Sequence, residues 1–250
     1  MKTPPTCPIC RARSLLLDTV DFNKSCEDHK GKVLPPDGMA VDYSLCPNCG
    51  FCFAPDLCAW PLEDFSEKIY NDQYVLVDPD YVEARPRINA ANMVAMLGDK
   101  ASGLKHLDYG GGGGLLSKLL GEAGWRSSSY DPFVDRDTAV ESLGQFDLIT
   151  SFEVFEHVPD PHQLMKSLRT LVAPHGVVMF STLLSDGNIK LGQKLTWWYA
   201  SPRNGHISLF SRGSLSLLAH EHGLQFGSFS VGFHALYTQV PPWARHMMGG

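Results

Sequence analysis

All seven cysteines of this 250-residue chain lie within its first 58 residues, and four of them form two Cys-Pro-x-Cys segments. A gap of two residues lets both thiolates of a tight turn point at one cation, and two such turns supply the four sulfurs of a tetrahedral Zn²⁺ site. Gly50 follows the second pair and permits the positive φ that such a turn needs. The predicted metal ligands of this zinc ribbon, which we expect over residues 1–60, are Cys7, Cys10, Cys46 and Cys49.

Two other ligand sets remain open on spacing alone. Cys49 and Cys52 are also separated by two residues, and Cys26-x-x-His29 is a further pair with metal-ligand spacing. A closed four-sulfur site leaves no open coordination position, so we expect it to stabilise the fold and not to catalyse a reaction. A core built from about 60 residues folds poorly without such a staple.

Composition narrows the class of protein. The chain is 44% hydrophobic and 19% charged, so it can bury a core and is not a disordered chain. Its net charge of −6 argues against a nucleic-acid or anionic-membrane partner, since both reward a basic surface. Neither an apolar run of about 18 residues nor a secretion signal is evident. We therefore expect a soluble cytoplasmic protein, in whose reducing surroundings the cysteines do not form disulfides.

The acidity is concentrated in residues 61–100. This segment holds eight acidic and four basic residues, which is −4 of the total −6. The composition predicts an acidic helical connector between the ribbon and the rest of the chain. Tyr70, Tyr74 and Tyr81 would alternatively suit a lid over a pocket.

Strand and helix patterns alternate from residue 104 onward. The expected strands are 104–109, 125–130, 146–152, 176–182, 224–229 and 233–239, and the expected helices follow Gly114, Asp160 and Ser211. This order predicts an α/β domain over residues 101–250 with a doubly wound parallel sheet, in which ligands bind at the carboxyl ends of the strands.

A run of five glycines, 110–114, follows the first of these strands directly after Asp108-Tyr109. Glycines let the backbone turn sharply and approach a ligand closely. Asp131 ends the second strand 21 residues after Gly110, where a carboxylate can accept both hydroxyls of an adenosine ribose. These features favour NAD or S-adenosylmethionine. Asp108 discriminates between them, because an acid here disfavours a pyrophosphate and suits the sulfonium and amino group of S-adenosylmethionine.

With residues 108–114, Asp131 and the segment 146–161 (FDLITSFEVFEHVPDP), the chain resembles class I S-adenosylmethionine-dependent methyltransferases, and among them the ubiquinone-pathway O-methyltransferases. The resemblance covers about residues 104–240 and implies a Rossmann-like doubly wound sheet, here preceded by the small four-cysteine zinc ribbon. It further implies the cofactor-binding residues Asp108, Gly110, Gly112, Asp131, Phe152 and Glu153, of which Asp131 would hold the ribose.

The middle of the chain departs from that family. Only 15 residues separate Asp131 from Asp147, so the third strand and the adenine-contacting acid that normally follows it are reduced or missing. A zinc ribbon ahead of such a domain is also similar to deoxysugar C-methyltransferases, whose further C-terminal domain has no counterpart here, and to some ribosomal-RNA guanine methyltransferases.

The segment Glu153-x-x-Glu156-His157 is the candidate catalytic group. On a helical turn these three side chains share a face, and two carboxylates with an imidazole suit a divalent cation such as Mg²⁺. A similar motif binds such a metal, together with a distant histidine, in small-RNA terminal 2′-O-methyltransferases, and His206 would be that histidine here. The alternatives are that His157 or His206 acts directly as a base, or that the group is structural.

We therefore expect an S-adenosylmethionine-dependent methyltransferase that acts on a hydroxyl of a small molecule or a sugar. The alternatives are an RNA methyltransferase whose ribbon binds RNA, a sugar C-methyltransferase-like enzyme, and a non-enzymatic module that recruits a partner. Only six basic residues in the first 60 speak against RNA, while Asp108, the glycines and Asp131 speak against the module.

Overall fold

The computed structural model describes residues 3–248, which form two compact units. The ribbon unit comprises Met1–Pro79, Phe155–His162 and Leu183–Leu218, and the sheet unit comprises Asp80–Val154, Gln163–Thr182 and Ala219–Gly250. The outer ends of the predicted ranges 1–60 and 101–250 lie outside the described residues. The chain therefore enters the ribbon unit three times, and each unit is described below by itself.

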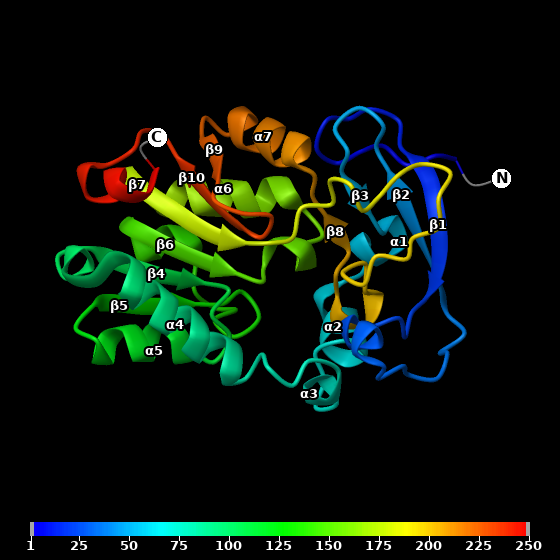
Figure 1. Cartoon of the computed structure of the whole chain (residues 1–250), viewed down its shortest axis with the longest axis horizontal. Helices are drawn as coiled ribbons and strands as arrows, with labels where there is room; N and C mark the ends of the chain where they lie inside the picture. The colour runs from blue at the N-terminus through cyan, green and yellow to red at the C-terminus, as the bar shows by residue number, and fades with distance from the viewer. Residues whose placement is uncertain (1–2, 249–250) are drawn as a thin grey trace. The chain divides into compact units, whose positions relative to one another are not determined.

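A six-stranded sheet in the order β5-β4-β6-β7-β10-β9 forms the centre of the sheet unit (Figure 1). Its strands are β4 (Lys105–Tyr109), β5 (Arg126–Tyr130), β6 (Phe146–Phe152), β7 (Val172–Ser181), β9 (Gln225–Ser228) and β10 (Phe233–Tyr237). Strands β5, β4, β6 and β7 run parallel, as predicted. Strand β10 runs antiparallel to both β7 and β9, because the short connection between β9 and β10 can only form a hairpin.

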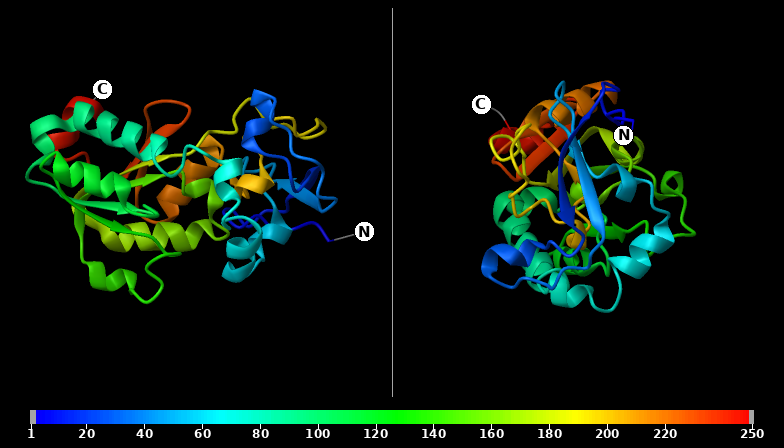
Figure 2. Two further views of the ribbon diagram at one scale, coloured as in Figure 1. Left: turned by 90° about the horizontal axis from the view of Figure 1, so that it is seen from below. Right: turned by 90° about the vertical axis from the view of Figure 1, so that its right-hand side faces the viewer.

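Helices cover both faces of this sheet. Helices α4 (Ala84–Leu97) and α5 (Leu115–Glu122) lie on one face and α6 (Pro161–Leu171) on the other (Figures 1 and 2). Leu116 and Leu120, one helical turn apart on α5, are buried in the same core as Leu148 of β6. The predicted α/β doubly wound architecture is therefore confirmed.

The sheet is shortened at the β5 edge. Between β5 and β6 the described chain forms only the short helix η3 (Val140–Leu143), and β5 is the last strand on this side. The absence of the usual third strand, expected from the short spacing after Asp131, is confirmed.

The ribbon unit contains an antiparallel sheet in the order β1-β2-β3-β8. Its strands are β1 (Leu15–Asp21), β2 (Ala40–Leu45), β3 (Cys52–Phe53) and β8 (Ser208–Leu209). Cys52 pairs with Leu209 and Phe53 with Ser208. The strand next to the second Cys-Pro-x-Cys segment is thus paired with a strand from far along the chain.

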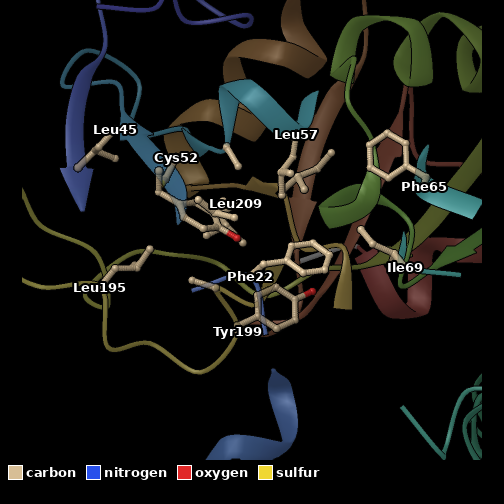
Figure 3. Close-up of a cluster of buried hydrophobic side chains, with 14 of the residues drawn as sticks. Phe22, Leu45, Cys52, Leu57, Phe65, Ile69, Leu195, Tyr199 and Leu209 are labelled. Atoms are coloured by element: carbon tan, nitrogen blue, oxygen red, sulfur yellow. The ribbon is translucent and has the colours of Figure 1, made fainter. Parts of the chain in front are cut away.

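Short helices and a compact core complete the ribbon unit. They are η1 (Cys26–Lys30), α1 (Pro55–Cys58), α2 (Leu62–Lys68), α3 (Tyr74–Val77), η4 (Phe155–His157) and η5 (Pro202–Asn204). The remaining helices of the chain are η2 (Gly98–Ala101), α7 (Arg212–Glu221), η6 (Pro242–Ala244) and α8 (Arg245–Met248). Phe22, Phe65, Tyr199 and Leu209 point into one apolar cluster drawn from all parts of this unit (Figure 3).

Membrane insertion finds no support in the helices. Over residues 3–248, none is long and apolar enough to cross a bilayer.

Candidate functional site

The glycine loop at the end of β4 has a backbone shape that only glycine fits. Gly110 has φ +79°, and its N–H donates to the carbonyl oxygen of Tyr130 over 2.8 Å. A Cβ atom on Gly110 would lie 2.4 Å from Cγ2 of Val154. At Gly112 and Gly113, by contrast, an added Cβ would meet nothing within 4 Å. The loop therefore packs tightly on one side and is open at its tip.

Asp108 lies directly beneath this loop. Its side chain is 3% exposed, and its Oδ1 accepts a hydrogen bond from Oγ1 of Thr150 over 2.9 Å. A Cβ on Gly111 would come within 2.5 Å of Oδ2 of Asp108. Burial raises the pKa of the Asp108 carboxyl to about 7, and the negative charge of Asp131 contributes in the same direction.

Asp131 connects the end of β5 to the same loop. Its Oδ2 accepts a hydrogen bond from the N–H of Gly112 over 2.9 Å, and its Oδ1 accepts one from the N–H of Phe133 over 2.8 Å. The structure thus brings Asp108, Gly110, Gly112 and Asp131 to one edge of the sheet, as the carboxyl ends of parallel strands should.

Glu153, directly after β6, has a strained backbone. Its φ is +56°, which is uncommon for a residue other than glycine and is often found at functional sites. Its N–H donates to Oγ of Ser181 over 2.8 Å, and that hydroxyl donates to Oε1 of Glu153 over 2.8 Å. Sequence reasoning missed Ser181, although it ends β7 opposite Phe152 in the register. Phe152 packs its ring 6.2 Å from that of Phe233.

These residues fit S-adenosylmethionine better than a dinucleotide. Asp108 and Asp131 place two carboxylates of like sign beside an open glycine loop. A pyrophosphate would be repelled by both, whereas a sulfonium and an ammonium group would be attracted. The burial of Asp108 strengthens this preference, because an ionised buried acid is costly unless a cation pairs with it.

The four predicted zinc ligands lie together in the ribbon unit. Sγ of Cys7 is 3.6 Å from that of Cys49, and Sγ of Cys10 is 3.3 Å from that of Cys46. All four sulfurs lie within 4.8 Å of one another. A tetrahedral site with Zn–S bonds of about 2.3 Å places its sulfurs about 3.8 Å apart. The cluster therefore has the dimensions of a zinc ribbon, and the alternative ligands Cys26, His29 and Cys52 are not part of it.

Both knuckles of this cluster use the same turn. The N–H of Arg11 donates to the carbonyl oxygen of Cys7 over 3.0 Å, and that of Gly50 donates to Cys46 over 2.9 Å. Gly50 has φ +75°, as predicted. Arg11, at the equivalent position of the first knuckle, adopts φ +61° although it carries a side chain. The strained arginine is a feature that the sequence did not reveal.

Glu156, His157 and His206 form a second cluster of metal-ligating side chains in the ribbon unit. One donor atom from each lies within 4.8 Å of the others, and Oε1 of Glu156 is 3.9 Å from Nε2 of His157. Glu156 is 0% exposed and His206 is 5% exposed. Glu153, which the sequence grouped with them, belongs to the sheet unit and directs its carboxylate to Ser181.

Hydrogen bonds orient both imidazoles of this cluster. Nδ1 of His206 lies 2.7 Å from the carbonyl oxygen of Tyr199, and Nδ1 of His157 lies 3.2 Å from that of Gly205. A carbonyl oxygen can only accept, so each Nδ1 carries the proton and each Nε2 carries the lone pair. The hydroxyl of Tyr70 adds a contact of 3.0 Å to Nδ1 of His157. Histidines that ligate metals or act as bases are held in this way.

Comparison with known proteins agrees with the site. A family model described as "Methyltransferase domain" matches residues 81–227. The ubiquinone biosynthesis O-methyltransferase of Colwellia psychrerythraea is 29% identical over 147 residues, covering 48% of this chain and 60% of that protein. That of Actinobacillus pleuropneumoniae serotype 7 is 34% identical, covering 34% of this chain and 49% of that protein. The chain thus spans about half the length of the curated relatives it matches.

The fold is shared with a solved structure. The 1,6-didemethyltoxoflavin-N1-methyltransferase of Burkholderia thailandensis, solved with 1,6-didemethyltoxoflavin and S-adenosylhomocysteine, has a TM-score of 0.50 and 19% identity to this chain. The match covers 81% of this chain and 96% of that one. With the glycine loop, its buried acid and the family match over more than half its length, the chain belongs to the class I S-adenosylmethionine-dependent methyltransferases.

Proposed function

We propose that this chain transfers a methyl group from S-adenosylmethionine to a hydroxyl of a small molecule or a sugar. The observation that carries the proposal is the buried carboxyl of Asp108 under the open glycine loop, which suits a cationic cofactor. The O-methyltransferase names of its relatives support oxygen as the methylated atom.

The chain's own residues would divide the work between them. The cofactor supplies a methyl carbon already activated by its sulfonium. Asp108 would attract the positive end of the cofactor, Asp131 would accept hydrogen bonds from the ribose, and Gly110 and Gly112 would let the backbone approach. Phe152 and Glu153 would line the site after β6. Methyl transfer forms an O–C bond as the S–C bond breaks, so the acceptor must lose its hydroxyl proton.

The proton acceptor we propose lies in the cluster of Glu156, His157 and His206. Because both imidazoles carry their proton on Nδ1, each presents the lone pair of Nε2. Nε2 of either histidine can take the acceptor's proton, and the carboxylate of Glu156 next to His157 would stabilise the resulting imidazolium. This is the direct-base form of the proposal.

A divalent cation in the same cluster is the second form. Two imidazoles and one carboxylate, with both Nδ1–H groups held by carbonyl oxygens, are a donor set that metals use. Mg²⁺ prefers oxygen ligands, so this donor set favours Mn²⁺, Fe²⁺ or Zn²⁺ instead. Such an ion would acidify a bound hydroxyl and so replace the base.

The activity is tested with the full chain. Isothermal titration should show binding of both S-adenosylmethionine and S-adenosylhomocysteine. Transfer of a radiolabelled methyl group is then assayed with catechols, with sugars and with RNA as acceptors. Transfer to a catechol or sugar hydroxyl is the expected result; cofactor binding with transfer only to RNA would overturn the acceptor class, and no cofactor binding would overturn the function.

Metal analysis separates the two forms of the acceptor site. If the cluster binds a metal, the purified chain should hold two equivalents, and His206→Asn should hold one, with transfer lost in parallel. His175→Asn, at an exposed histidine outside the cluster, is the matched control. If the wild-type chain holds only one equivalent and turns over at full rate after chelation, the metal form is wrong and the direct-base form stands.

A further inference from the structure

A line of buried polar side chains leads away from Asp108 along one face of the sheet. His106 and Thr150 are both 0% exposed, and they lie on β4 and β6. In the parallel register Asp108 is opposite Thr150, and His106 is opposite Ser127 of β5. Because residues two apart on a strand share a face, these side chains meet beneath α5. Buried polar groups in a sheet core are costly, so their arrangement calls for an explanation.

The side chains form a continuous chain of hydrogen bonds. Oγ1 of Thr150 donates to Oδ1 of Asp108 over 2.9 Å, and Nε2 of His106 lies 3.0 Å from the same Oγ1. Nδ1 of His106 lies 2.7 Å from Oγ of Ser127. The Ser127 hydroxyl in turn lies 2.8 Å from that of Ser117 on α5. The chain thus runs from the cofactor loop to the helix that follows it.

The ionised acid fixes the direction of this chain. A carboxylate can only accept, so the single proton of the Thr150 hydroxyl points at Asp108. Thr150 then has only an acceptor to offer His106, whose proton must lie on Nε2. Nδ1 of His106 is left to accept from the hydroxyl of Ser127. Every donor therefore points toward the negative charge, and aligned hydrogen bonds strengthen one another.

His106 itself remains neutral in this environment. Burial lowers the pKa of its imidazole to about 3, and the ring of Trp125 packs edge-on at 5.6 Å. It therefore acts by choice of tautomer and not by carrying a charge. The charged group that faces Asp108 from a neighbouring strand is Asp131, which opposes ionisation, whereas Thr150 favours it.

We propose that His106 is a positioning residue for cofactor binding, which acts through Thr150 to hold Asp108 in the ionised form that a cationic cofactor requires. This inference rests on the proposed binding of S-adenosylmethionine at Asp108. When Asp108 is protonated, the same chain can reverse, with Thr150 donating to Nε2 and the imidazole proton on Nδ1. A histidine satisfies both states, which an apolar residue or a fixed donor does not.

The test compares His106→Leu with wild type across pH. In the variant Thr150 loses its donor, so the carboxylate form of Asp108 is less stabilised. We expect affinity for S-adenosylmethionine to fall about tenfold at pH 7, which corresponds to one pKa unit, and to recover toward the wild-type value at pH 9. His234→Leu is the matched control, because His234 is also 0% exposed in this sheet but bonds Ser228 and the carbonyl of Thr182.

A second pair of variants keeps the test decisive if His106→Leu does not fold. Thr150→Val removes the hydroxyl and should shift the pH midpoint of binding upward, while Thr150→Ser restores it. Nitrogen NMR of the imidazole should show the proton on Nε2 of His106 in the S-adenosylhomocysteine complex. If wild type binds but these variants keep its pH midpoint, or if the proton lies on Nδ1, the inference is wrong. If wild type does not bind at all, the proposed function fails instead.

Discussion

The hydroxyl of Tyr43, in the middle of β2, donates a hydrogen bond to the backbone carbonyl of His206 over 2.7 Å. Tyr43 is 0% exposed, and burial raises its pKa well above the usual value, so the hydroxyl remains a donor at all ordinary pH values. The sheet that carries the second knuckle thus also holds the backbone of a candidate catalytic histidine. The cysteine cluster and the histidine cluster are parts of one rigid framework within the ribbon unit.

Replacement of Tyr43 by Phe tests this framework. The variant leaves a buried carbonyl oxygen without its donor, so the free energy of unfolding should fall by about 1–3 kcal/mol. Methyl transfer should fall as well, while S-adenosylhomocysteine binding in the sheet unit persists. Tyr237→Phe, on β10, serves as the control, and titration calorimetry with thermal unfolding gives the readout. Unchanged stability and transfer in Tyr43→Phe would show that this bond does not position His206.

Loss of one cysteine ligand should release the zinc. Cys46→Ser removes a sulfur from the four-sulfur cluster, and the bound metal contributes directly to folding of such sites. We expect zinc content to fall by one equivalent and the melting temperature to drop. Cys58→Ser, outside the cluster with its Sγ 4.0 Å from the carbonyl of Ile207, should retain the metal. Equal zinc content in the two variants would contradict the assigned ligands.

The glycine loop makes a prediction with two separable causes. Gly110→Ala should weaken S-adenosylhomocysteine binding at least tenfold, since it adds both backbone strain at φ +79° and a clash with Val154. Combining it with Val154→Ala removes the clash and should recover only part of the affinity. Gly121→Ala, in α5 with no atom within 4 Å of the added Cβ, should bind normally. Normal binding by Gly110→Ala would refute the assigned role of the loop.

Asp108→Asn should separate stability from function. The pKa of Asp108 is raised by burial to about 7, so in the cofactor-free protein its stabilising protonated form is lost as pH rises through 7. The asparagine variant avoids this loss. We expect it to unfold at a higher temperature than wild type at pH 8, to differ less at pH 5, and to bind S-adenosylmethionine weakly at both. A variant less stable than wild type at pH 8 would contradict the burial argument.

Much of the fold followed from local patterns in the sequence. The apolar run at Phe146–Phe152 and the helical spacing of Leu116 and Leu120 are periodic signals that burial imposes, and both elements lie where predicted. The missing third strand was also foreseeable, because chain length between Asp131 and Asp147 limits what can form. The glycine loop and its two acids came together because parallel strands end at one edge.

The features that were missed depend on contacts distant in sequence. Nothing local to Tyr43 indicates that its hydroxyl meets residue 206, or that Ser181 bonds Glu153. The positive φ of Glu153 removes it from the helical face assumed for it and Glu156. His106 is preceded and followed by ordinary strand residues, so only the sheet register reveals that it serves Thr150.

The pairing of β3 with β8 bears on how the protein is made. Cys52 and Phe53 are synthesised early, yet their partners Leu209 and Ser208 leave the ribosome about 150 residues later. The knuckles can capture zinc as soon as Cys49 emerges, but the edge of β3 then waits unpaired, and exposed strand edges invite association with other chains. Early metal capture would keep the waiting segment compact, so zinc-starved cells should accumulate aggregated nascent protein rather than an inactive folded form.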